Sequence, residues 1–72
     1  MTEKEEMYLL EKIMEQAKER LEKEKRSTYY KYSYYLDDAE KEIDDAVREY
    51  CRGWISFDRA SSKIERILRR TL

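Results

Sequence analysis

Apolar residues recur every three or four positions along most of this 72-residue chain, which is the spacing of one face of an α-helix. The first such stripe follows Thr2 and Glu5, a pair typical of a capping box at a helix start. It consists of Met7, Leu10, Met14, Ala17 and Leu21, widened by Leu9 and Ile13. The pattern predicts a first helix over residues 3–26.

Two further stripes predict two further helices. The second ends just before Gly53, which suits the left-handed residue that commonly follows a helix, and it predicts a helix over residues 29–52. Ser56 is typical of an N-cap, so a third helix is predicted over residues 57–71. The second stripe consists of Tyr32, Leu36, Ala39, Ile43, Ala46, Val47 and Tyr50, and the third of Phe57, Ala60, Ile64, Ile67, Leu68 and Thr71.

The boundary between the first two helices is the weakest part of the pattern. No apolar residue lies between Leu21 and Tyr29, and Ser27 and Thr28 both belong to the residue types that favour helix starts. We therefore predict a turn near Ser27. Because this segment holds neither glycine nor proline, one continuous helix is the alternative.

These elements predict an all-α fold in a single domain over residues 1–72. The architecture is a three-helix bundle, made of an antiparallel helical hairpin and a shorter third helix. At 1.5 Å per residue, the first two helices reach roughly 35 Å and the third about 22 Å. Since the third helix leaves part of the hairpin uncovered, we predict a homodimer that forms through the hairpin. A larger helical oligomer is the alternative.

The charges of the chain nearly cancel, but they alternate along the sequence. The chain is 46% charged with a net charge of −1, and its 40% hydrophobic content is too high for a typical disordered protein. The net charge is −3 over residues 1–24, +3 over 25–36, −5 over 37–50 and +4 over 51–72. Adjoining blocks of opposite sign predict electrostatic pairing within one chain or between chains.

The residue types present argue against catalysis and metal binding. The chain has no histidine, and its only cysteine, Cys51, lies at the edge of the second stripe, where we interpret it as a half-buried apolar residue. A single glycine excludes a phosphate-binding glycine loop. The second helix carries several carboxylates, but no histidine accompanies them as in a di-iron site. Nor do they lie in a loop like that of an EF-hand. They are Asp37, Glu40 and Asp44 on one side and Asp38, Glu42, Asp45 and Glu49 on another. We expect no enzyme activity, no cofactor and no metal.

The sequence also favours a cytoplasmic location. No apolar run approaches the roughly 20 residues of a transmembrane helix, and the acidic amino terminus lacks the hydrophobic stretch of a signal peptide. A lone cysteine is not the pattern of a secreted, disulfide-bonded domain. We therefore expect no membrane association.

A run of tyrosines forms the first candidate contact surface. Tyr30 and Tyr34 lie one helical turn apart and are expected to point outward beside Lys31. Tyrosine is enriched in protein contact sites, and it also forms the stacking platforms of single-stranded nucleic-acid binders. The simpler interpretation is that these amphipathic rings only cover a helix end.

A basic row on the third helix forms the second candidate surface. Its residues stand at i, i+4, i+7 and i+11 and are Arg59, Lys63, Arg66 and Arg70. Like charges at this spacing repel one another slightly, so we expect an acidic surface against them. Three candidates for this acidic surface are the second helix of the same or another chain, a partner protein and a nucleic-acid backbone. The simpler interpretation is a solvated basic face near a helix C-terminus.

These features predict a protein-interaction module that acts as an inhibitor, adaptor or regulatory subunit of a larger macromolecular machine. Small inhibitors from phages and mobile elements are one such class. The alternative is a nucleic-acid-binding accessory protein that uses the basic outer face of the third helix. The net charge of −1 and the strongly acidic block over residues 37–50 argue against that alternative.

Overall fold

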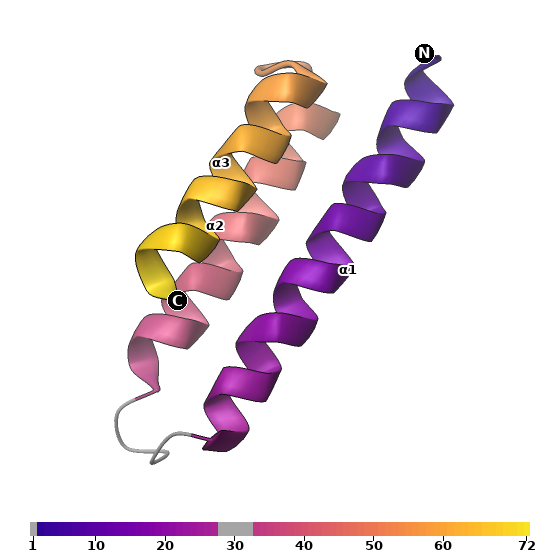
Figure 1. The fold of residues 1–72 in the computed structure, drawn as a ribbon. Helices are drawn as coiled ribbons and strands as arrows, with labels where there is room; N and C mark the ends of the chain where they lie inside the picture. The colour runs from indigo at the N-terminus through magenta and orange to yellow at the C-terminus, as the bar shows by residue number, and fades with distance from the viewer. Residues whose placement is uncertain (1, 28–32) are drawn as a thin grey trace.

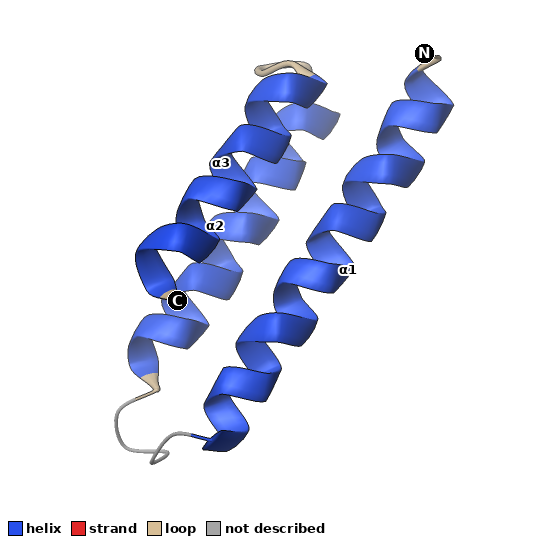
Figure 2. Ribbon diagram, in the orientation of Figure 1, coloured by secondary structure: helices blue, strands red, loops and turns tan. Residues whose placement is uncertain are grey.

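The computed structural model describes residues 2–27 and 33–72 and shows three α-helices there (Figures 1 and 2). They are α1 (Glu3–Ser27), α2 (Tyr34–Cys51) and α3 (Phe57–Thr71). α2 runs antiparallel to α1, and α3 returns beside both (Figure 1). Within the described ranges there is no β-strand. The predicted all-α, three-helix architecture is confirmed.

The start of α2 differs from the prediction. The helix begins at Tyr34 and not at residue 29, and positions 29–32 lie outside the described residues. Ser33 precedes the helix, and its carbonyl accepts hydrogen bonds from the N–H groups of Leu36 (3.0 Å) and Asp37 (3.2 Å). Because α1 and α2 run in opposite directions, the alternative of one continuous helix is wrong. The prediction from helical periodicity alone placed the start of α2 too early, because no glycine or proline marks that start in the sequence.

Local capping interactions fix the starts of α1 and α3 where the sequence predicts them. The Thr2 hydroxyl accepts a hydrogen bond from the Glu5 N–H (3.2 Å) and donates one to the Glu5 carboxylate (3.2 Å). At α3, the Ser56 hydroxyl accepts from the Arg59 N–H (3.2 Å). Each cap satisfies a backbone donor that has no partner within its helix.

Gly53 ends α2 in the predicted left-handed conformation, with a φ of 76°. Its N–H donates to the Tyr50 carbonyl (3.0 Å), and the Trp54 N–H donates to the Glu49 carbonyl (2.9 Å). These two hydrogen bonds form a Schellman motif. The motif turns the chain sharply, so that α3 can start after a short link and fold back along α2.

The core of the bundle is aliphatic. It joins residues from all three helices, and no aromatic side chain is among the buried residues of the described chain. The buried residues are Leu10, Ala17, Leu21, Leu36, Ala39, Ile43, Ala46, Val47, Ala60, Ile64 and Ile67. All of them belong to the stripes predicted from the sequence. Since alanine lets neighbouring helices approach closely, this core leaves little room for aromatic rings.

We expect Gly53→Ala to destabilise the protein by about 1–2 kcal/mol, the cost of forcing an L-residue into the left-handed region. A methyl group at this position would meet no atom within 4 Å, so the effect is purely conformational. Gly53→Asn is the matched control, and it should cost less because asparagine tolerates this conformation. Urea unfolding measures the free energy of unfolding of the wild type and both variants. Equal stability of wild type and Gly53→Ala would contradict the role assigned to the turn.

Candidate protein-contact surfaces

The basic row of α3 is partly neutralised within the chain. The Lys63 ammonium lies 2.8 Å from the Glu49 carboxylate, and Arg70 pairs with Glu42. These contacts place half of the row against one acidic side of α2, so the second helix of the same chain is the acidic surface for Lys63 and Arg70.

Two members of the basic row, Arg59 and Arg66, behave differently. Both are exposed, and neither forms an ion pair with a residue in the described part of the chain. Arg66 lines a groove of about 310 Å³ between α2 and α3. Its charged lining consists of Glu42, Asp45, Glu49, Lys63, Arg66 and Arg70, so acidic and basic groups balance there.

The other acidic side of α2 faces α1. Lys18 lies 2.6 Å from Asp44, and the Lys25 ammonium lies 2.5 Å from Asp37 and 3.3 Å from Glu40. The predicted pairing of opposite charge blocks is therefore present within one chain. α2 is an acidic helix held between basic residues of its two neighbours.

Lys25 also contacts Glu22 (3.2 Å), which makes it the centre of three carboxylates. Its hydrogen bond to Asp37 raises the pKa of the Lys25 ammonium above its usual value, although partial burial opposes this. Burial, followed by a hydrogen bond with Glu22, raises the pKa of Glu40. Hydrogen bonds with Glu40 and Lys25 lower the pKa of Glu22. The cluster ties the C-terminal turn of α1 to the first turns of α2.

Of the predicted tyrosine surface, only Tyr34 can be placed, because Tyr30 and Lys31 lie outside the described residues. Tyr34 is the first residue of α2 and is 70% exposed. Its neighbour Tyr35 is 45% exposed. The start of α2 thus presents two adjacent aromatic rings to solvent.

Sequence reasoning missed two exposed aromatic residues, Tyr8 (59% exposed) and Trp54 (66% exposed). In a Schellman motif, the residue in the position of Trp54 usually packs against the last turn of the helix. Here the two helix positions that usually make this contact hold the charged residues Arg48 and Glu49. The Arg52 guanidinium instead lies over the Trp54 ring, 5.2 Å from its centroid.

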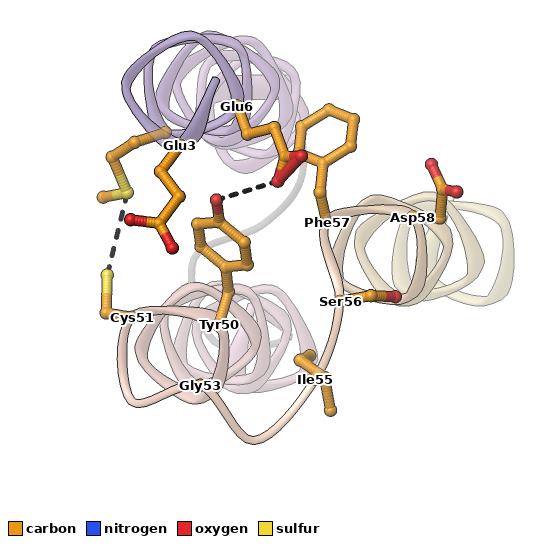
Figure 3. Close-up of a pocket in the computed structure, with 10 residues that line it drawn as sticks. Glu3, Glu6, Tyr50, Cys51, Gly53, Ile55, Ser56, Phe57 and Asp58 are labelled. Carbon is orange, nitrogen blue, oxygen red and sulfur yellow. Dashed lines mark hydrogen bonds between the residues drawn. The ribbon is translucent and has the colours of Figure 1, made fainter. Parts of the chain in front are cut away.

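A recess of about 650 Å³ lies where α1 begins, α2 ends and α3 begins (Figure 3). We call this recess, together with Trp54, the open end of the bundle. The Tyr50 hydroxyl points across it and donates to the Glu6 carboxylate (3.1 Å). Burial and this contact with Glu6 raise the pKa of Tyr50. Glu3 and Asp58 add two further carboxylates to the lining.

Cys51 also lines the recess, where its thiol lies 3.8 Å from the Met7 sulfur. The cysteine is exposed, not half-buried as predicted, because it stands at the edge of α2 in the last helical position.

Within residues 2–27 and 33–72, no group of three or more cysteine or carboxylate side chains is arranged to hold a metal ion. None of the helices described is long and apolar enough to cross a membrane.

Comparisons with known proteins found no likeness: no family model, no curated protein and no solved structure matches this chain.

We expect the free energy of unfolding to fall as the pH rises above about 10, the usual pKa of tyrosine and close to that of lysine. Both Tyr50 and Lys25 have raised pKa values in the fold, so their stabilising effect is complete below the unfolded-state pKa and is lost as the pH rises through the folded-state pKa. Tyr50→Phe should reduce the loss, whereas the control Tyr8→Phe should not. Urea unfolding between pH 8 and pH 11 measures the slopes, and identical slopes for both variants would contradict the assignment to Tyr50.

Proposed function

We propose that this protein is a protein-interaction module, without catalytic activity of its own, that acts in the cytoplasm as an inhibitor, adaptor or regulatory subunit of a larger macromolecular machine. The observation that carries the proposal is the exposure of its aromatic side chains. Tyr8, Tyr34, Tyr35 and Trp54 lie in solvent, while the core is aliphatic.

The exposed rings favour protein contacts for an energetic reason. Burying a large aromatic side chain on association removes much apolar surface from water, at a lower entropy cost than ordering a long flexible side chain. Tyrosine, tryptophan and arginine are also the residues that most often dominate binding energy. Tyr8, Tyr34, Tyr35 and Trp54 are exposed in the folded bundle and are therefore available to a partner.

We assign the main contact to the surface around Tyr34, because it is the most exposed of these rings and Tyr35 stands beside it. At this end of the bundle, Lys25 and Asp37 are paired with each other, so a partner that covers the tyrosines need not neutralise those two groups. Such a surface suits a mainly apolar contact with charges at its rim.

Binding of nucleic acid through α3 is the second candidate. Its support is Arg59 and Arg66, which are exposed and form no ion pair in the described chain. Lys63 and Arg70 offer less to a phosphate backbone, because a nucleic acid would have to compete with Glu49 and Glu42 for them. Because acidic and basic groups balance in the α2–α3 groove, we rank nucleic-acid binding below protein binding.

The proposal predicts that Tyr34→Ala loses a partner that wild type captures from cells of the native host, at least tenfold by quantitative mass spectrometry, because a buried aromatic anchor commonly contributes 2 kcal/mol or more. Tyr8→Ala is the matched control, since it removes an exposed tyrosine from another surface. An unchanged set of partners in Tyr34→Ala would contradict the proposed contact. Recovery of nucleic acid that is lost in Arg66→Glu would favour the second candidate.

A homodimer through the hairpin remains part of the proposal. α3 pairs with α2 only as far as Glu42, and the hairpin continues beyond its end (Figure 1). Leu21 and Leu36 in this region are fully buried within one chain, so a second copy would cover mainly Tyr35 and Leu72, which are about half exposed.

Light scattering at high micromolar concentration tests the dimer. The expected mass is twice 8.9 kDa, and Tyr35→Ser should shift it toward the monomer by removing apolar area from the contact. Trp54→Ser is the control at the other end of the bundle. A monomer mass for wild type would contradict dimerisation.

A further inference from the structure

We propose that the open end of the bundle binds a basic segment of a partner protein and takes an arginine or lysine side chain into its recess. This inference rests on the proposed function, because it assigns a partner chemistry to a second contact surface of the same module. It concerns the end of the bundle opposite Tyr34 (Figure 1).

The charges that line the recess are complementary to a basic segment. Glu3, Glu6 and Asp58 line the recess, and no lysine or arginine is among its described lining residues. The α2–α3 groove, in contrast, balances its carboxylates with basic groups. With a net charge of only −1, the chain as a whole attracts cations weakly, so the carboxylates that line the recess matter more than the total charge.

The lining of the recess also has the shape and chemistry that fit a lysine or arginine side chain. Met7, Ile55 and Phe57 supply apolar surface beside the carboxylates (Figure 3). A lysine or arginine side chain has the matching structure, with an apolar stem and a cationic head. A metal ion or a small anion would leave the apolar part of the recess unused.

Trp54 also supports the binding of a cationic side chain at the open end. Its chain neighbours Gly53 and Ile55 both line the recess, and its indole is 66% exposed. Acidic residues in a first helical turn stabilise the helix by themselves, which accounts for Glu3 and Asp58 without any partner. Helix stability does not account for an indole held in solvent. The Arg52 guanidinium of the same chain already lies over this ring, 5.2 Å from its centroid, which shows that the indole accepts a cationic side chain.

Trp54 also provides the measurement, because it is the only tryptophan of the chain. A hexa-arginine peptide with blocked ends is the probe, and hexa-glutamate is the charge-reversed control. We expect hexa-arginine to change the Trp54 fluorescence in a saturable manner and hexa-glutamate to leave it unchanged. Replacing two carboxylates of the recess in Glu3→Gln/Asp58→Asn should weaken hexa-arginine binding about tenfold.

The matched control is Glu11→Gln/Glu19→Gln, which removes the same charge from exposed positions of α1 outside the recess. It should change the affinity less than twofold. Thermal unfolding first checks that both double variants are folded, and Glu3→Gln alone replaces the recess variant if Asp58→Asn unfolds α3. Absence of saturable binding, or equal weakening by both double variants, would overturn the inference.

The two proposals fail separately. If hexa-arginine does not bind but Tyr34→Ala still loses its partner, the inference is wrong and the proposed function stands. If hexa-arginine binds as expected but Tyr34→Ala keeps every partner, the contact assigned to Tyr34 is wrong and the open end remains.

Discussion

The packing of aliphatic side chains between three helices is the interaction on which the rest of this structure depends. Ala17, Ala39, Ala46 and Ala60 contribute small side chains to that core, beside fully buried leucine and isoleucine residues such as Ile43. Small residues favour close approach of the helices, and protein interiors tolerate few voids. A core of this kind has no place for nine aromatic rings, and those that the structure describes lie partly or largely in solvent.

The charged residues organise what the core holds together. α2 carries carboxylates on two sides, and each side faces a basic partner: Lys18 and Lys25 from α1, and Lys63 and Arg70 from α3. Exposed ion pairs contribute only about 0–1 kcal/mol each, so we assign them to register and orientation more than to stability. The alternation of charge along the sequence is therefore largely resolved within the chain, whereas the carboxylates of the recess at the open end have no lysine or arginine beside them in the lining.

Local signals made the helices predictable, and their absence explains the main error. Ser56 and Gly53 act through hydrogen bonds to nearby residues, so the start of α3 and the end of α2 follow from short sequence patterns. The start of α2 has neither glycine nor proline, and Ser33, its N-cap, stands in a run of tyrosines whose spacing in the sequence is helical. Apolar spacing shows which face is buried but not where the chain turns.

The candidate sites were predictable only where they follow a helical spacing. The basic row was visible for that reason, but its pairing with Glu42 and Glu49 depends on tertiary register. Tyr8 is isolated in the sequence and gave no pattern. The open end joins the start of α1 to the α2–α3 turn, which lies far from it in the chain, so no local sequence pattern predicts this site. Trp54 follows a turn glycine, a position at which an apolar residue normally packs.

The folded chain by itself keeps Tyr8, Tyr34, Tyr35 and Trp54 in solvent, where a partner can bury them. Quenching of Trp54 fluorescence by acrylamide tests this directly, since that indole is the only one in the chain and is 66% exposed. We expect the folded protein to be quenched nearly as strongly as the urea-unfolded chain, at both low and high protein concentration. Strong protection of Trp54 in the folded protein would show that the core or a second copy covers the indole, and would contradict the account.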